Sequence, residues 1–217
     1  AHESGIAPRP RYFNPELGVL VCDYLPPDED QTLDPNELAK LVQTIHHLPH
    51  VHYRLDLGER IRRYCRQLRS SQPGMSVALE NLDRAAAHLL AEVTATTGGQ
   101  CLCHNDISRE NLLRSGGRLY ALDWEYCAMG NRWFDLAACI LNSGLEACRQ
   151  DALLESYLER SITDGDRQLL EKWTCLVRYL ELLWYLSQRP DHLSPEVIDK
   201  TVDDLLSTAD GFRNLTK

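Results

Sequence analysis

Polar side chains between His104 and Asp123 have the types and the order that phosphoryl transfer to a hydroxyl requires. His104, Asp106 and Asn111 form an H-x-D-x-x-x-x-N pattern, and Asp123 follows a short apolar run. In this chemistry one carboxylate orients the attacking hydroxyl and accepts its proton, while an amide oxygen and a second carboxylate hold Mg²⁺. We therefore take Asp106 as the candidate catalytic base, and Asn111 and Asp123 as the candidate metal ligands.

The residues that follow the pattern predict a β-hairpin that would bring the two metal ligands together. Leu112-Leu113 and Leu119–Leu122 are short apolar runs, and the Ser115-Gly116-Gly117 stretch between them suits a tight turn because glycine tolerates positive φ. Asn111 would then enter one strand and Asp123 would leave the other. Asp106 would lie in the loop that precedes the hairpin.

A chance match is the alternative interpretation, because short motifs often occur without their function. His104 and Asp106 would then cap a loop, and Asp123 would cap a helix. The neighbouring residues favour the functional interpretation. The sequence H-N-D-I-S-R-E-N-L-L, followed by L-D-W-E-Y and F-D-L-A, resembles the aminoglycoside phosphotransferase and choline kinase superfamily, and the resemblance extends from about Gly5 to about Tyr185.

The resemblance implies a fold, cofactors and an activity. The fold would be α+β and protein-kinase-like, with residues 1–27 forming the end of the N-terminal lobe and the hinge. Residues 28–217 would form the mainly helical C-terminal catalytic lobe. The activity would be ATP- and Mg²⁺-dependent phosphorylation of a hydroxyl on a small molecule. The L-D-W-E-Y sequence is similar to the choline, ethanolamine and thiamine kinase branch, and an aminoglycoside or a sugar is the alternative acceptor.

Aromatic and acidic residues after the metal segment are the candidate acceptor-binding residues. A carboxylate next to an aromatic ring, as in Glu125-Tyr126, suits an ammonium group through charge and cation–π attraction. The resemblance also places a tyrosine that matches Tyr126 at the choline site. It implies an acceptor-binding role for Trp184 and Tyr185 as well, although aromatic residues at helical spacing are also typical of a core.

Four further roles follow from the resemblance alone. Tyr24 and Leu25 would lie where the hinge meets the adenine of the nucleotide, with an ordinary strand-to-loop exit as the alternative. His104 would steady the catalytic loop. Asp135 would hydrogen-bond the same loop, and we also expect it to cap the helix that follows.

The chain departs from the superfamily pattern upstream of the hinge. Members carry a phosphate-covering loop and a lysine that pairs with the nucleotide phosphates. Here no glycine-rich stretch precedes Val19, and the first lysine is Lys40. Two interpretations stay open, namely a fragment of a longer enzyme and a non-catalytic, pseudokinase-like remnant that has lost half of its nucleotide site.

Composition limits the partners of the chain. The 217 residues carry a net charge of −9, which disfavours nucleic acid and anionic membrane surfaces and suits a cationic small molecule. No apolar run is long enough to span a membrane, and no signal-peptide pattern is present, so we expect no membrane partner. The eight cysteines lack the spacing of a disulfide framework, which favours a cytoplasmic location. The oligomeric state is not predicted.

Apolar residues at helical spacing predict most of the remaining elements. One helix should begin at Pro35, with Asp34 as its cap and Glu37 reaching back to complete a capping box. Val19–Cys22 should be a buried strand, and Gln100–Cys103 a strand that leads into the catalytic loop. Further helices are expected over residues 57–68, 79–93, 153–158 and 169–186, and from Ser194 onward.

Two groups of potential zinc ligands occur in the sequence, and we assign neither of them to a metal site. A histidine cluster follows the first predicted helix: His46, His47, His50 and His52. It has no acidic or cysteine partner at fixed spacing, so surface histidines, or cationic histidines at a helix C-terminus, are the better interpretation. The Cys101-x-Cys103-His104 sequence lacks the second ligand pair of a zinc finger.

Overall fold

The computed structural model describes residues 1–71, 76–96, 99–189 and 194–215. The chain divides into two compact units, and each unit is built from two separate stretches: Ala1–Arg54 with Gln100–Asp164, and Leu55–Gly99 with Gly165–Lys217. The lobe boundary expected at residue 27 is a different division and stays a prediction. No helix among the described residues is both long enough and apolar enough to span a membrane.

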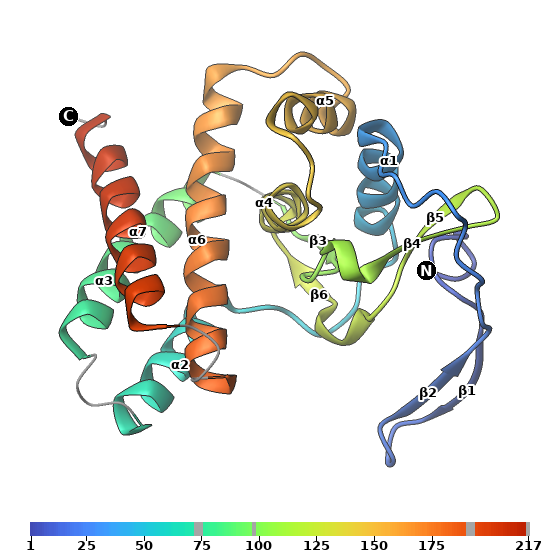
Figure 1. The fold of residues 1–217 in the computed structure, drawn as a ribbon, viewed down its shortest axis with the longest axis horizontal. Coiled ribbons are helices and arrows are strands. Elements are labelled where there is room, and N and C mark those ends of the chain that lie inside the picture. Colours follow the sequence, from blue (N-terminus) through green and yellow to red (C-terminus); the bar gives the residue numbers. More distant parts are fainter. Residues whose placement is uncertain (72–75, 97–98, 190–193, 216–217) are drawn as a thin grey trace. The chain divides into compact units, whose positions relative to one another are not determined.

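The first unit combines helices with small antiparallel sheets, each of two strands (Figure 1). Its strands and α-helices are, in chain order, β1 (Pro10–Asn14), β2 (Val19–Cys22), α1 (Pro35–His46), β3 (Cys101–Cys103), β4 (Leu112–Ser115), β5 (Arg118–Ala121), β6 (Ala128–Gly130), α4 (Arg132–Asn142) and α5 (Ala147–Leu158). Two 3-10 helices, Arg109–Asn111 and Trp124–Tyr126, flank the β4–β5 hairpin. This mixture of helices and small sheets agrees with the predicted α+β class.

The start of α1 follows from its sequence. The Asp34 carboxylate accepts hydrogen bonds from the backbone N–H groups of Asn36 at 2.9 Å and Glu37 at 3.1 Å, and Pro35 at the first helical position has no N–H to satisfy. The predicted capping box is wrong, because the Glu37 carboxylate forms an ion pair with Arg114 instead. A guanidinium is a stronger, charge-assisted partner for a carboxylate than a backbone N–H.

The core of the first unit is built by the apolar faces of its helices. Leu38, Val42 and Ile45 of α1 are fully buried, and so are Leu136 of α4 and Leu153 of α5. The three residues of α1 are spaced three to four residues apart, which gives this helix one apolar stripe. Each such side chain contributes about 1.5–3 kcal/mol when it leaves water. α1 also packs on β3, so this helix supports the strand that precedes the catalytic loop.

β1 and β2 form an antiparallel hairpin, with Phe13 opposite Leu20. The strand expected at Val19–Cys22 is confirmed, but the expectation that it is buried is wrong. Val19, Leu20 and Val21 are 39%, 59% and 48% exposed. A run of apolar residues is buried in a strand only where a second layer covers the sheet, and here the side chains of β2 remain open to solvent.

β4 and β5 form the hairpin that the sequence predicts. Leu112 lies opposite Ala121, and Ser115 lies opposite Arg118. Gly116-Gly117 makes the turn with φ values of 56° and 73°, a backbone conformation that glycine adopts without steric cost. The register therefore fixes Asn111 and Leu122 at the open end of one hairpin.

The described part of the second unit is helical. Its helices are α2 (Leu57–Ser71), α3 (Ser76–Thr96), α6 (Asp164–Gln188) and α7 (Pro195–Leu215), all of which the apolar spacing predicts. Helix α2 continues through Ser71, three residues beyond the predicted helix over residues 57–68, and residues 72–75 lie outside the described residues. Trp173 is fully buried, as expected for a core residue, and Lys172 forms an ion pair with Glu92.

Candidate active site

The catalytic loop connects β3 with the 3-10 helix Arg109–Asn111. β3 pairs with β6, with Cys101 opposite Gly130. Sequence analysis missed this pairing, because Ala128-Met129 is the only apolar signal of β6. A side chain at position 130 would place its Cβ 3.4 Å from the sulfur of Cys103.

Asp135 of α4 holds the start of the catalytic loop. Its carboxylate is fully buried and accepts hydrogen bonds from the backbone N–H groups of His104 at 2.7 Å and Asn105 at 2.6 Å. The expectation that Asp135 caps α4 is wrong. Asn131 occupies that position and accepts a hydrogen bond from the N–H of Trp133 at 3.0 Å. Asp135 lies in the first turn of the helix, where the helix dipole favours a negative charge.

Asp106 and Asn111 are in direct contact. The Asn111 amide nitrogen donates to the carboxylate of Asp106 at 2.8 Å and to its backbone carbonyl at 3.0 Å. Both partners are acceptors, which fixes the orientation of the amide, so its oxygen is the atom available to a cation. Burial raises the pKa of Asp106 above its ordinary value and the charge of Asp123 adds to the increase, whereas the hydrogen bond from Asn111 acts in the opposite direction.

Asp123 reaches the same region from the end of the hairpin. The N–H of Leu122 donates to the carbonyl of Asn111 at 2.8 Å, so the residue before Asp123 is bonded to the other candidate ligand. Asp123 is exposed and adopts a left-handed conformation with φ 56° and ψ 71°, which aspartate tolerates better than most residues. Asp106, Asn111 and Asp123 therefore lie close together.

His104 connects the two halves of this site. Its side chain is fully buried, and its Nε2 donates to the carbonyl of Leu122 at 2.9 Å. Its ring also packs on the ring of Trp124, with 4.8 Å between the ring centroids. The loop that carries Asp106 is thereby tied to the two residues on either side of Asp123.

Asn105 is a site residue that sequence analysis missed. It has a positive φ of 64°, and its amide nitrogen donates to the backbone carbonyl of Tyr126 at 2.9 Å. Glu125 is exposed and Tyr126 is half-buried, and both lie in the short 3-10 helix after Asp123. The available signal was the residue type, because asparagine is one of the few residues that adopt a left-handed conformation readily.

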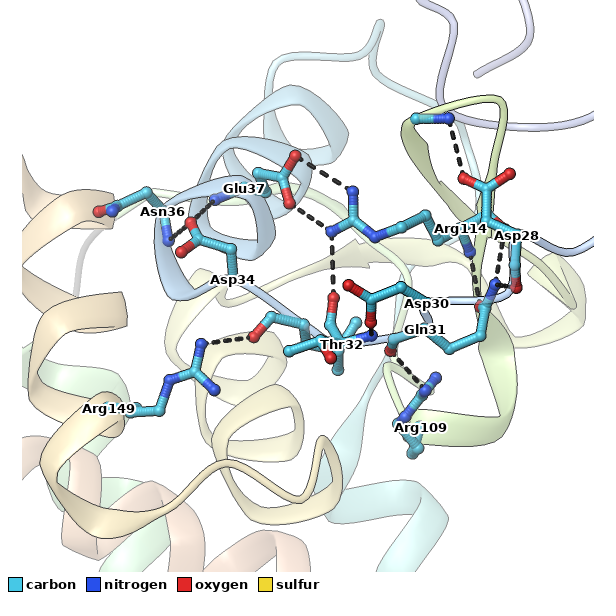
Figure 2. Close-up of polar contacts among 12 residues, drawn as sticks. Asp28, Asp30, Gln31, Thr32, Asp34, Asn36, Glu37, Arg109, Arg114 and Arg149 are labelled. Atoms are coloured by element: carbon cyan, nitrogen blue, oxygen red, sulfur yellow. Dashed lines mark hydrogen bonds and ion pairs between the residues drawn. The ribbon is translucent and has the colours of Figure 1, made fainter.

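The segment between β2 and α1 is fastened to the hairpin and the loop (Figure 2). The Asp28 carboxylate accepts hydrogen bonds from the N–H groups of Gly116-Gly117 at 2.8 and 2.9 Å. Gln31 exchanges side-chain hydrogen bonds with the backbone of Arg114, and Arg109 donates to the carbonyl of Gln31 at 2.6 Å. The polar composition of this segment gave no sign of these contacts.

Four predicted site residues lie outside this cluster of contacts. Tyr24 and Leu25 follow β2, where Tyr24 is 83% exposed and Leu25 is half-buried. Trp184 and Tyr185 are half-buried on α6, with their rings in edge-to-face contact at 5.1 Å. Because α6 belongs to the second unit, the position of these two rings relative to Asp106 stays a prediction.

His46 is the last residue of α1, so the expected position at a helix C-terminus is confirmed for this residue, whereas the expected surface position is wrong. It is buried, with Nδ1 2.7 Å from the hydroxyl oxygen of Tyr157 and Nε2 3.2 Å from the carboxylate of Asp135. The signal was present in the sequence. His46 continues the stripe of Leu38 and Val42 at a spacing of four residues, so the face of the helix that packs on the core includes it.

Comparisons with known proteins identify the family of the chain. Residues 8–173 match the model of the phosphotransferase enzyme family. A LicA homolog from Mycoplasma capricolum subsp. capricolum is 24% identical over 182 residues, which are 82% of this chain and 72% of that protein. A thiamine kinase from Escherichia coli is 30% identical over 136 residues, which are 61% of this chain and 46% of that protein.

Solved structures show the same fold. A choline/ethanolamine kinase family protein from Mesorhizobium loti has a TM-score of 0.78 at 20% identity and covers 97% of this chain, which matches 74% of that chain. Choline kinase LicA from Streptococcus pneumoniae has a TM-score of 0.77 at 21% identity, and the match covers 97% of this chain and 76% of that chain. A structure of LicA in complex with AMP has a TM-score of 0.75 at 22% identity, and the match covers 95% of this chain and 75% of that chain. The predicted protein-kinase-like fold is therefore confirmed, and the extent of the family match shows that this chain belongs to the phosphotransferase enzyme family.

Proposed function

We propose that this chain transfers a phosphoryl group from ATP to the hydroxyl of a small, positively charged alcohol, in a reaction that depends on Mg²⁺. Family membership supports the class of reaction. The acceptor class is suggested by the names of the similar proteins, which include a choline kinase and a thiamine kinase. Choline and thiamine each carry a hydroxyethyl group and a permanently charged nitrogen.

The contact between Asp106 and Asn111 carries this proposal. Asp106 would accept a hydrogen bond from the acceptor hydroxyl, orient it and take its proton as the new bond to phosphorus forms. A half-buried carboxylate with a raised pKa is a stronger base than an exposed one. Asn111 keeps one carboxylate oxygen of Asp106 engaged at 2.8 Å, which fixes the direction of the other oxygen.

The donor set beside this base suits Mg²⁺, which prefers oxygen ligands from carboxylates and amides. The Asn111 amide oxygen and the exposed Asp123 carboxylate would hold the ion, while His104 keeps their backbones together through Leu122. When bound, Mg²⁺ would neutralise charge on the nucleotide phosphates.

Glu125 and Tyr126 would receive the charged nitrogen of the acceptor. They come directly after Asp123, and Asn105 links the backbone of Tyr126 to the catalytic loop. A negative charge and an aromatic face together attract an ammonium group. Trp184 and Tyr185 would add aromatic surface to the acceptor site, and Tyr24 with Leu25 would contact the adenine. Binding of AMP by the similar LicA protein supports a nucleotide site.

The test is a panel of acceptors, assayed with protein expressed from its complete gene. Choline, ethanolamine, thiamine and kanamycin are incubated with ATP and Mg²⁺, and ADP release is followed together with the mass of the product. We expect phosphorylation of at least one of the first three compounds at a rate that falls with Asp106→Asn. Kanamycin is a much larger alcohol with several positive charges, so turnover of kanamycin alone would contradict a small choline-like or thiamine-like acceptor and favour the aminoglycoside alternative. Absence of transfer to any acceptor would contradict the enzymatic function.

A further inference from the structure

Three metal-ligating side chains come together outside the proposed Mg²⁺ site. The imidazole of His46, at the end of α1, meets the thiols of Cys101 and Cys103 on β3, and one potential ligand atom from each lies within 4.8 Å of the other two. The two cysteines are separated by one residue in a strand, so their side chains project from the same face. The two sequence groups that each lacked partners are therefore neighbours in the fold.

The distance between the two sulfurs fits a tetrahedral ion. Cys101 Sγ and Cys103 Sγ are 3.8 Å apart. Zinc–sulfur bonds are about 2.3 Å long, and in a tetrahedral site they place two sulfurs about 3.8 Å apart. The strand therefore presents a thiolate pair that needs little rearrangement to chelate such an ion.

The surroundings of His46 resemble the support that metal-bound histidines usually have. Such a histidine binds the ion through one ring nitrogen and hydrogen-bonds a carboxylate or another polar group through the other nitrogen. Tyr157 and Asp135 stand at the two nitrogens of His46, so either one could keep its contact while the other nitrogen turns to the ion. Asp135 would in both cases retain its hydrogen bonds from His104 and Asn105.

The site is accessible to an ion from one side. Cys101 is half-buried whereas Cys103 is fully buried, so Cys101 forms the entrance. A thiolate is the form that binds metal, so binding of the ion would release the protons of the two thiols.

We propose that His46, Cys101 and Cys103 bind a single thiophilic cation, and that Zn²⁺ is the ion that this ligand set fits. One imidazole and two thiolates are ligands that Zn²⁺ prefers, whereas Mg²⁺ binds oxygen. This site is distinct from the one at Asn111 and Asp123. It lies at the head of the catalytic loop, because Cys103 is followed directly by His104.

The test titrates Co²⁺, as a spectroscopic substitute for Zn²⁺, into metal-free protein kept reduced by a reagent without thiols. We expect one Co²⁺ per chain, a near-ultraviolet charge-transfer band from thiolate ligands and the strong visible bands of four-coordinate cobalt. Zn²⁺ should displace the Co²⁺, and a large excess of Mg²⁺ should not. Absence of the charge-transfer band in the unmodified protein would overturn the proposal.

Variants identify the ligands. Cys101→Ser should remove about half of the charge-transfer absorbance. It should also weaken Zn²⁺ binding by at least about tenfold, because loss of a residue that only supports a metal ligand already weakens binding by about that much. His46→Gln keeps polar atoms for Tyr157 and Asp135, and it should weaken binding while the band remains. Cys148→Ser, which changes an exposed cysteine, is the matched control and should bind like the unmodified protein.

A second measurement keeps the proposal testable if a variant fails to fold. In the unmodified protein, Zn²⁺ should protect Cys101 from alkylation and leave Cys148 reactive, as mass spectrometry of the digested protein would show. Equal protection of both cysteines, an unchanged band in Cys101→Ser or unchanged affinity in His46→Gln would each overturn the three-ligand site.

Discussion

The carboxylate of Asp135 accepts a 2.7 Å hydrogen bond from the backbone N–H of His104, although 31 residues separate the two in the chain. This contact joins α4 to the start of the catalytic loop. The other oxygen of Asp135 accepts from the N–H of Asn105, and His46 Nε2 lies 3.2 Å from the oxygen that accepts from His104. One fully buried side chain therefore determines where the loop that carries Asp106 begins.

Asp135→Asn should lower the free energy of unfolding by about 2–4 kcal/mol. The substituted amide places N–H groups against a backbone N–H, which leaves buried donors unsatisfied and removes a charge-assisted acceptor. Urea denaturation followed by circular dichroism measures the change. Asp203→Asn, which changes an exposed aspartate of α7, is the matched control and should stay within about 0.5 kcal/mol of the unmodified protein.

Asp106→Asn should lower kcat by about 10²–10⁴-fold, the usual contribution of a positioned general base. The amide has nearly the same shape as the carboxylate but cannot take up the proton of the substrate hydroxyl. The thermal midpoint should not fall, because the half-buried carboxylate is destabilised by desolvation. The nearby Glu110→Gln removes one charge from the exposed surface of the 3-10 helix that follows the loop, and it should leave kcat within a few-fold. Equal losses in the two variants would point to a general charge effect and argue against a base.

Asp123→Asn should raise the Mg²⁺ concentration needed for half-maximal activity and weaken binding of the Mg²⁺-nucleotide complex. A neutral amide attracts a divalent cation less strongly than a carboxylate does. Calorimetry with a non-hydrolysable ATP analogue, with and without Mg²⁺, isolates the effect, because binding without Mg²⁺ should change little. If affinity falls equally in both conditions, Asp123 does not act through the metal.

Tyr126 should contribute to acceptor binding through its aromatic face. Tyr126→Phe keeps that face and should change the KM for a charged acceptor little. Tyr126→Ala removes it and should raise this KM about 5–30-fold, the equivalent of 1–2 kcal/mol from a cation–π contact. The KM for ATP should stay the same in both variants, which separates an acceptor effect from a general defect. A larger KM in Tyr126→Phe than in Tyr126→Ala would contradict the assignment.

Local sequence predicted the elements whose signals are local. The β4–β5 hairpin followed from apolar runs on either side of two glycines, and α1 followed from Asp34-Pro35 and its apolar stripe. Contacts between distant segments could not be read in this way. β3 pairs with β6 across 27 residues, and the Asp28 carboxylate holds the turn of a hairpin 88 residues away. Such contacts depend on the path of the whole chain, which short-range periodicity does not encode.

Two of the predictions that failed share one cause. β2 has the apolar composition of a buried strand, but burial depends on a covering layer and not on the strand itself. We expected His46 at the surface because histidine is polar, yet it lies on the face of α1 that packs against the core and contacts Asp135. In both cases residue type indicated one environment and tertiary context supplied another.

Cys101 should react with iodoacetamide at a lower pH than an ordinary cysteine. The S–H of Cys103 stabilises the Cys101 thiolate and lowers its pKa to about 7, and only the thiolate is alkylated. In metal-free protein, the alkylation rate of Cys101 should therefore rise with pH and reach half of its maximum near pH 7.

Cys103→Ala removes the donor, so this midpoint should move to higher pH. Cys103→Ser keeps a donor and should shift it less. The exposed Cys148, followed by mass spectrometry in the same samples, controls for the reagent. A midpoint that does not move in Cys103→Ala would mean that the thiol pair does not interact.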